Sequence, residues 1–343
     1  MANDEGRKAV DEILQALIAQ ILRIYDGARM GIRLTVKKFL SDFKVKDEAM
    51  RKKVAMGKMT QAAYLQWRYN QFLTAKRWRE MFGKLTKDFV NADKLAMEIV
   101  NDSMIEAFGI GLNYSVFTAD KATKGGVTAE GSFTLYNKEA VKNLIKNNPQ
   151  LLPAPSVDIP KDERWNMQKI SSVVTQSLLQ GVTVDDLAEK LQQVTNMDET
   201  AAIRNARTMI TNAENAGRYE AYKRLEKMGV FVKMQWIATK DERTRAAHAY
   251  LGGKTAPVGG TFTIPTNHDP HNKTGEPRSI RYPGDPLAAP DLVYNCRCRL
   301  VSIIDHERTA AESFGPKGLT GVTRMSFEEW QKFQKEREAK KHG

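Results

Sequence analysis

The first part of the chain is dominated by apolar residues that recur with the period of an α-helix. Between Ala9 and Phe43 they follow one another at intervals of three or four positions, beginning Val10, Ile13, Leu14, Leu17 and Ile18. This spacing places the side chains on one face of a helix, and so long a helix must bury that face against a partner. Further helices are expected over Gln61–Met81, with Thr60 as the N-cap, and over Leu85–Phe108. The pattern therefore predicts a basic helical region over residues 1–110.

The pattern changes after residue 110. Apolar and polar residues alternate over Leu112–Thr118 and Val127–Tyr136 on either side of a polar, glycine-containing stretch, which predicts a β-hairpin. A short helix from Asn137 to Lys146 follows, and then N-N-P-Q-L-L-P-A-P. The three prolines of that stretch remove backbone donors and favour an extended chain. We therefore place the hairpin and short helix at 111–148 and a proline-rich linker at 149–155.

The remainder of the chain combines helices with a compact mixed region. Helical spacing returns over Arg164–Gln180, Val184–Val194 and Glu199–Met228, within a segment 156–230. Predicted strands at Phe231–Ile237 and Leu300–Ile304 bracket a stretch rich in Gly, Pro, Asn and Thr, which favours turns over long helices.

These features predict a compact, loop-rich α+β core over 231–305. A charged tail helix capped by Ser326 lies within 306–343. The fold class expected is mainly α with a small C-terminal α+β domain.

The composition is that of a folded, water-soluble protein. Hydrophobic residues make up 41% of the chain and the mean hydropathy is -0.49, which excludes disorder throughout. The longest apolar run, Ile13–Ile24, is interrupted by polar residues and is too short to span a membrane. The first residues lack the basic region of a secretory signal, so we expect synthesis in a reducing cytosol.

The charge is strongly basic and unevenly distributed. Lys and Arg number 53 against 41 Asp and Glu, a net charge of +12, and residues 1–100 contribute 20 basic and 12 acidic residues, or +8. A basic surface favours polyanions such as DNA, or an acidic protein partner. The candidate nucleic-acid contacts are Lys52, Lys53, Arg68, Arg77 and Arg79. The alternative is a solvated basic face beside an aromatic helical core.

Both cysteines of the chain lie in one short motif, C-R-C, at Cys296 and Cys298. Residues i and i+2 of a strand share one face, so in a strand both sulfurs would point to the same side. Two thiols and His248 form a candidate zinc site, since zinc prefers tetrahedral nitrogen and sulfur ligands. His268, His271 or Asp241 could supply the fourth ligand.

Two other interpretations of these residues remain open. The cysteines could be reduced core residues beside a structural histidine, because one C-x-C lacks the second cysteine pair of a typical zinc motif. Asp241, His248 and Cys296 could also form a hydrolytic triad, which is defined by spatial geometry. The sequence contains no local signature of a known cysteine peptidase.

Several separated motifs resemble one protein family in the expected order. They are W-I-A-T-K-D-E-R-T-R-A-A-H from Trp236, P-G-D-P at 283–286 and N-C-R-C-R-L from Asn295, with A-A-I-R-N-A-R-T-M-I-T-N-A-E-N-A-G-R-Y-E-A-Y upstream and M-S-F-E-E-W downstream. Together these motifs resemble the Mu F-like head morphogenesis family, the minor head proteins of tailed bacteriophages. The resemblance covers about half of the chain, from Ser156 to Trp330.

The resemblance implies a structural, non-enzymatic protein of the virion. It implies a role in procapsid assembly and in DNA packaging or ejection, at the portal vertex inside the head. The implied partners are the portal protein, a scaffold or major capsid protein, and phage DNA. We expect these residues to hold the shape of the C-terminal core: Trp236, Asp241, Arg243, Asp285 and Asn295.

Two competing functions follow from the same sequence. One is a metal-dependent hydrolase or toxin-like enzyme that uses His248, Asp241 and the two cysteines. Mu F-like domains can be fused to C-terminal toxin domains, but only a short predicted helix follows Trp330, so we expect no such domain. The other is a DNA-binding accessory protein, whose affinity would fall steeply with salt.

Overall fold

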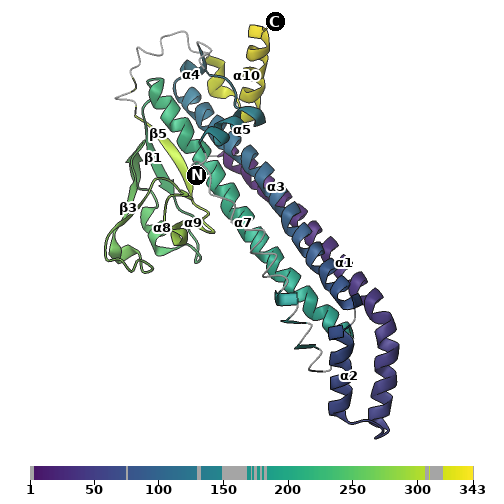
Figure 1. Cartoon of the computed structure of the whole chain (residues 1–343). Helices are drawn as coiled ribbons and strands as arrows, with labels where there is room; N and C mark the ends of the chain where they lie inside the picture. Colours follow the sequence, from purple (N-terminus) through teal and green to yellow (C-terminus); the bar gives the residue numbers. More distant parts are fainter. Residues whose placement is uncertain are drawn as a thin grey trace. The chain divides into compact units, whose positions relative to one another are not determined.

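The computed structural model describes residues 4–74, 76–129, 133–148, 184–305 and 320–342, with short runs at 168–170, 172–173 and 176–177 and single residues at 180 and 309. The protein is mainly α-helical, with small antiparallel sheets in its C-terminal part (Figure 1). This confirms the predicted fold class. The predicted linker at 149–155 and most of the helix predicted at Arg164–Gln180 lie outside the described residues.

The chain forms two compact units, each assembled from separate stretches of sequence. The first contains Met1–Leu17, Val100–Ala154 and Arg204–Gly343, and the second contains Ile18–Ile99 and Pro155–Ile203. The predicted domains are contiguous ranges, whereas these units interleave along the chain. Within the part of the chain that the structure describes, no helix has an apolar stretch long enough to cross a bilayer.

Long helices contain most of the residues that the structure describes. They are α1 (Glu5–Ala55), α2 (Gln61–Thr74), α3 (Lys76–Ala122) and α7 (Val184–Lys227). The shorter ones are α4 (Gly126–Ala129), α5 (Lys138–Asn147), α8 (Ala246–Leu251), α9 (Pro290–Val293) and α10 (Phe327–His342). Single 3-10 turns occur at Thr266–His268 and Thr320–Arg324. The two helices predicted over Val184–Met228 form the single helix α7.

The predicted helix caps are confirmed. The Thr60 hydroxyl accepts the Ala63 N–H over 3.1 Å before α2. At the start of α10, the Glu329 N–H donates to the Ser326 hydroxyl over 3.2 Å, and the Ser326 N–H donates to the Glu329 carboxylate over 2.8 Å. This reciprocal pair is a capping box, in which two backbone donors without helical partners are satisfied.

The predicted hairpin at Leu112–Thr118 and Val127–Tyr136 is wrong. Leu112–Thr118 belongs to α3, and Gly126–Ala129 forms α4. Every residue of 111–117 is buried, so this part of α3 has no polar face and its apolar spacing carries no helical period. Residues 133–137 are neither strand nor helix. There the Tyr136 N–H and C=O pair with the side chain of Asn113 on α3, over 3.1 and 3.0 Å.

Helices α3 and α7 touch backbone to backbone in the first unit. A Cβ atom added to Gly217 would lie 2.1 Å from the carbonyl oxygen of Phe108, and one added to Gly111 would lie 2.2 Å from that of Glu214. No real Cβ atom tolerates such distances, so the crossing requires glycine at both positions. The tight crossing leaves residues 208–219 of α7 buried on all sides.

A three-stranded antiparallel sheet packs beside α7 in the same unit. Its strands are β1 (Val232–Ile237), β2 (Thr255–Pro257) and β5 (Arg299–Ile304), with β1 in the centre. Trp236 pairs with Leu300 across β1 and β5. A second sheet pairs β3 (Phe262–Ile264) with β4 (Arg278–Ile280). The strands predicted at Phe231–Ile237 and Leu300–Ile304 are thus confirmed.

Candidate functional site

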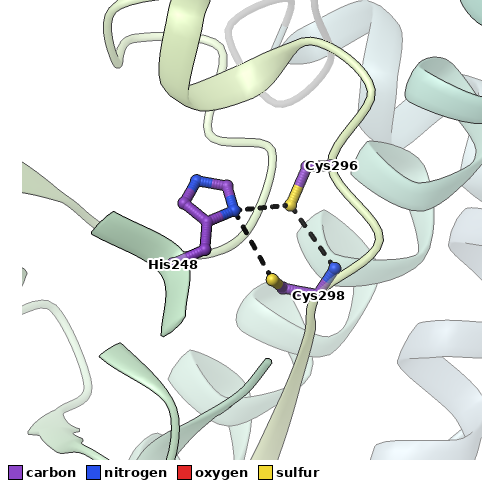
Figure 2. A group of neighbouring side chains, drawn as sticks. All are labelled: His248, Cys296 and Cys298. Carbon is purple, nitrogen blue, oxygen red and sulfur yellow. Dashed lines mark hydrogen bonds between the residues drawn. The ribbon is translucent and has the colours of Figure 1, made fainter. Parts of the chain in front are cut away.

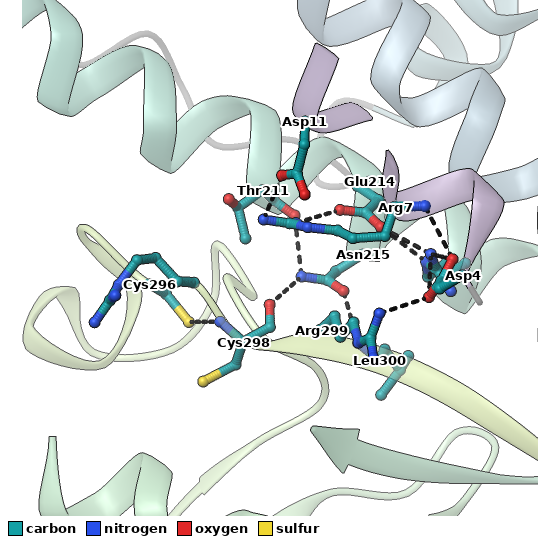
Figure 3. Close-up of polar contacts among 12 residues, drawn as sticks. Asp4, Arg7, Asp11, Thr211, Glu214, Asn215, Cys296, Cys298, Arg299 and Leu300 are labelled. Carbon is teal, nitrogen blue, oxygen red and sulfur yellow. Dashed lines mark hydrogen bonds and ion pairs between the residues drawn. The ribbon is translucent and has the colours of Figure 1, made fainter. Parts of the chain in front are cut away.

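The motif N-C-R-C-R-L is fixed to helix α7 at both of its ends, and Figure 3 shows the contacts of its second end with Asn215. At its start, the Asn295 N–H donates to the Thr208 hydroxyl over 2.8 Å, and Asn295 adopts a left-handed backbone conformation with φ 59°. At its end, the Asn215 side chain donates to the carbonyl oxygen of Cys298 over 3.1 Å and accepts the Leu300 N–H over 2.8 Å. Asn tolerates left-handed backbone better than other non-glycine residues. The turn at Asn295 directs the following segment toward α8.

The structure brings His248, Cys296 and Cys298 together. Figure 2 shows the ring of His248, on α8, facing both sulfur atoms, and its Nδ1 lies 3.5 Å from each Sγ. All three side chains are buried, with exposed fractions of 2%, 1% and 2%. A strand was predicted at this point, but Cys296 and Cys298 precede β5. The two sulfurs therefore lie together in an irregular segment that follows the left-handed turn at Asn295.

Each of the two thiols changes the pKa of the other. The hydrogen bond from the Cys296 side chain lowers the pKa of Cys298, and the contact with His248 lowers it further. The same pairing, together with burial, raises the pKa of Cys296 well above its usual value. Backbone N–H groups also point at both sulfurs. The Cys298 N–H donates to Cys296 Sγ over 3.4 Å, and the Thr239 N–H donates to Cys298 Sγ.

The residues predicted as fourth ligands do not join this cluster. Asp241 forms a bidentate ion pair with Arg297, in which one contact spans 2.7 Å. This ion pair lowers the pKa of Asp241. His268 stacks on the Tyr250 ring with centroids 4.2 Å apart, and His271 is exposed. Among the described residues, the group of His, Cys, Asp and Glu able to share a metal here consists of three members. The triad of Asp241, His248 and Cys296 is therefore not assembled.

The other motif residues make internal contacts. Trp236 is fully buried. Its ring makes T-shaped contacts with the rings of His248 and Phe262, at centroid distances of 5.3 and 5.5 Å. The buried carboxylate of Asp285 accepts from Arg281 Nε over 2.9 Å and from the Leu287 N–H over 3.0 Å. Arg243 is exposed and donates its N–H to Asp241.

Gly284 explains why the turn P-G-D-P contains a glycine. Its φ is +83°, and a Cβ atom at this position would lie 1.9 Å from the side-chain oxygen of Asn212 on α7. Both the backbone conformation and the close approach exclude a side chain there. The turn therefore docks directly on α7.

A buried charge cluster in the first unit was not predicted (Figure 3). The guanidinium of Arg218 on α7 is 2% exposed and contacts Glu214 over 2.8 Å and Asp4 over 3.0 Å. Arg7 reaches Glu214 over 2.6 Å, and Arg299 on β5 reaches Asp4 over 3.0 Å. The cluster joins the first turn of α1 to α7 and to the strand that follows the cysteines.

The sequence contained one signal of this cluster. Glu214 and Arg218 are the charged pair, four residues apart, in a run of small and apolar residues (A-E-N-A-G-R-Y) that a helix would otherwise bury. Such a pair inside a buried helix face indicates partners elsewhere, because buried charges are rarely left unpaired. The partners themselves, Asp4 and Arg7, are ordinary polar residues at the start of a helix.

The candidate nucleic-acid contacts divide into three groups. Lys52 and Lys53 are exposed in the last turn of α1. Arg68 is only 3% exposed and pairs with Asp47 over 3.2 Å. Its buried side chain is therefore poorly placed to contact a phosphate. The side chains of Arg77 and Arg79 lie outside the described part of the structure. The stacking of Phe43 on Trp67, 5.8 Å between centroids, gives at least part of the aromatic helix a core role.

Comparison with known proteins identifies a matching family and two similar proteins. Residues 168–301 match the family described as Phage Mu protein F like protein. The chain is 28% identical over 211 residues to Minor head protein GP7 of Bacillus phage SPP1, which covers 59% of this chain and 62% of that protein. It is 27% identical over 174 residues to NAD(+)--arginine ADP-ribosyltransferase EFV of Enterococcus faecalis (strain ATCC 700802 / V583), which covers 51% of this chain and 33% of that protein.

Each match covers only part of the relative's own sequence. The chain spans about three-fifths of the length of the phage protein and about a third of the transferase. No solved structure shows significant similarity to the chain.

Proposed function

Residues 168–301 belong to the Mu F-like head morphogenesis family, and we propose from this premise that the chain is a phage minor head protein with a structural role. The observation that carries the proposal is the similarity to Minor head protein GP7 of Bacillus phage SPP1, which extends over 59% of this chain. The proposed role is in procapsid assembly and in DNA packaging or ejection at the portal vertex, inside the head. The chain is made in the cytoplasm of the bacterial host and joins the virion there.

The internal contacts of the motif residues support a structural role. Asp241 is held by Arg297, Asp285 by Arg281, and Asn295 by Thr208. These polar groups are engaged with the protein itself, and none of them is directed at a shared reacting centre. Residues engaged in this way fix the shape of a surface, which is what an assembly component requires.

The proposed partner is the portal protein, with a scaffold or major capsid protein as further contacts. The test is a phage that carries a stop codon in this gene, grown with and without the chain supplied from a plasmid. We expect virions made without the chain to lose infectivity, and the plasmid copy to restore both infectivity and its presence in purified particles. Co-expression of the chain with the portal protein of the same phage should yield a complex on affinity purification. Fully infectious virions that lack the chain would refute the proposal.

The relative named as an ADP-ribosyltransferase calls for a direct test of activity, although only 33% of that protein is matched. We propose that this chain has no transferase activity. Purified chain would be incubated with labelled NAD and an arginine-containing acceptor, beside the Enterococcus faecalis relative as a positive control. We expect no label transfer above that of heat-denatured chain. Transfer at a rate comparable to the control would overturn the non-enzymatic assignment.

DNA contact is a second candidate function, favoured by the net charge of +12 and by exposed lysines near the end of α1. The exposed residues are Lys46, Lys52, Lys53 and Lys58. The double variant Lys52→Glu and Lys53→Glu should weaken DNA binding and reduce the salt dependence by about one unit of slope per lost phosphate contact. The matched control is Lys142→Glu with Lys146→Glu on α5, the same change of charge at other exposed positions. Equal weakening by both pairs would exclude a specific contact at the end of α1.

A further inference from the structure

We propose that His248 Nδ1, Cys296 Sγ and Cys298 Sγ bind a zinc ion that stabilises the fold. The three ligand atoms lie within 4.8 Å of one another, and all three residues are buried. The ligands come from two segments, the short helix α8 and the turn that precedes β5. The inference stands on this geometry and is independent of the proposed function.

The distances match those of a zinc tetrahedron. Zinc binds thiolate sulfur at about 2.3 Å and imidazole nitrogen at about 2.0–2.1 Å, which places the nitrogen and each sulfur about 3.6 Å apart at the tetrahedral angle. His248 Nδ1 lies 3.5 Å from Cys296 Sγ and 3.5 Å from Cys298 Sγ. Both edges of the ligand triangle that involve nitrogen therefore have the expected length.

Both sulfurs lie at the same distance from one imidazole nitrogen. A neutral imidazole nitrogen offers either one lone pair or one N–H, so it makes one good hydrogen bond in the plane of the ring. Here two sulfurs approach the same nitrogen equally closely. A cation placed between the three atoms would contact all of them at once.

The surroundings of the sulfurs suit thiolate ligands. Each sulfur accepts a backbone N–H, Cys296 from Cys298 over 3.4 Å and Cys298 from Thr239. Hydrogen bonds to metal-bound groups orient the ligands and tune their basicity. The other ring nitrogen, His248 Nε2, is buried and has no hydrogen-bond partner among the described residues. Zinc at Nδ1 leaves the ring proton on Nε2, so the cost of this burial, about 1–3 kcal/mol, is not relieved by the ion itself.

The ligands are held in place by packing and by backbone contacts. The ring of His248 packs against Trp236, and the carbonyl of Cys298 is fixed by Asn215. Because the ligands are buried and the neighbouring Asp241 is occupied by Arg297, we assign the ion to stability and not to hydrolysis. The ion would join α8 to the turn before β5, two segments about 50 residues apart in sequence.

Metal content and cobalt substitution test the proposal on the full-length chain. The chain would be purified under reducing conditions, dialysed against zinc chloride and then against buffer, and analysed by mass spectrometry for elements. We expect one zinc ion per chain. Replacement of zinc by cobalt should give a sulfur-to-cobalt charge-transfer band and the intense visible bands of a tetrahedral site. A chelator should lower the melting temperature, and added zinc should restore it.

Variants locate the site. His248→Gln and Cys298→Ser should weaken cobalt binding by more than about 100-fold, whereas the control His268→Gln, a histidine of the same region outside the cluster, should bind as the original chain does. If the ligand variants fail to fold, the cobalt titration of the unmodified chain still decides the matter. A folded chain that retains no zinc and gives no charge-transfer band, with the cysteines either free or joined as a disulfide, would overturn the proposal.

Discussion

The side-chain amide of Asn215 donates a hydrogen bond to the carbonyl oxygen of Cys298, 83 residues further along the chain, over 3.1 Å. The same side chain accepts the N–H of Leu300 over 2.8 Å. One residue of a helix thus makes the two bonds that a neighbouring strand would make to this segment. The position of the cysteines depends on this residue of α7 as well as on their own sheet.

Asn215→Ala should destabilise the protein by about 2–4 kcal/mol, because it leaves a buried carbonyl and a buried N–H without partners. The free energy of unfolding in urea measures the loss. The control is Gln235→Ala, which removes a side-chain bond to the Gly253 carbonyl at an exposed position and should change stability by less than about 0.5 kcal/mol. Similar losses in the two variants would show that Asn215 has no special role.

Gly217→Ala should destabilise the protein by about 3 kcal/mol or more, because the new methyl group would meet the Phe108 carbonyl and force α3 and α7 apart. Gly27→Ala, in the middle of α1, has nothing within 4 Å of the new methyl group. It should increase stability by about 0.5–1 kcal/mol, since alanine favours helix. The two variants make the same chemical change with opposite expected signs, and thermal or urea unfolding distinguishes them. Equal effects would contradict the tight crossing.

Asp4 should contribute stability that depends on pH. Burial alone would raise its pKa, but the charge and hydrogen bonds of Arg218 outweigh burial and hold the pKa of Asp4 below its usual value. A carboxyl whose pKa is lower in the folded state stabilises the fold above its unfolded pKa, near 4, and the contribution is lost as the pH falls. Asp4→Asn should therefore cost about 2–3 kcal/mol at neutral pH, and the difference from the original chain should shrink toward about pH 3.

The control for this pH dependence is Asp102→Asn. Asp102 forms an exposed ion pair with Lys138 over 3.4 Å, in the same compact unit. Its removal should change stability by less than about 1 kcal/mol at any pH, because exposed pairs are screened by water. A difference for Asp4→Asn that stays constant between neutral and acidic pH would contradict the assigned role of the carboxylate.

Two buried tryptophans provide a matched comparison. The Trp330 indole N–H donates to the buried carboxylate of Asp120 over 2.8 Å, whereas the Trp236 N–H has no partner within the described residues. Both rings are fully buried, so replacement by Phe removes a similar volume in each case. Trp330→Phe should cost about 1–3 kcal/mol more than Trp236→Phe, because it also removes a hydrogen bond to a charged group. Unfolding in urea gives both values, and equal losses would be the contrary result.

The sequence predicted those elements whose signals are local. The apolar stripe that begins at Val10 identified α1, and Ser326 with its acidic first turn identified the start of α10. The lengths were less well predicted. The breaks expected near Phe108 and near Val194 are absent, because helices α3 and α7 are stabilised by packing that their own residues do not reveal.

The candidate site was predicted from residue type, although one step of that argument was wrong. Two cysteines and a histidine were expected to meet, and they do, but Cys296 and Cys298 lie in an irregular segment before β5 and not in a strand. The contacts of Asp4 with Arg218 and Arg299 were not predictable from spacing, because the partners are more than 200 residues apart in sequence. Contacts between residues this far apart produce no periodic pattern in the sequence.

The ion pair between Asp4 and Arg299 joins residues that are 295 positions apart. During synthesis from the N-terminus, the first turn of α1 leaves the ribosome long before its charged partners on α7 and β5 exist. The first unit can complete this charge cluster only after Arg299 has emerged, so part of its assembly waits for contacts between residues far apart in sequence. Translation through Arg299 is thus a prerequisite for a finished first unit, and products that terminate before this residue should be recognised as unfolded and degraded.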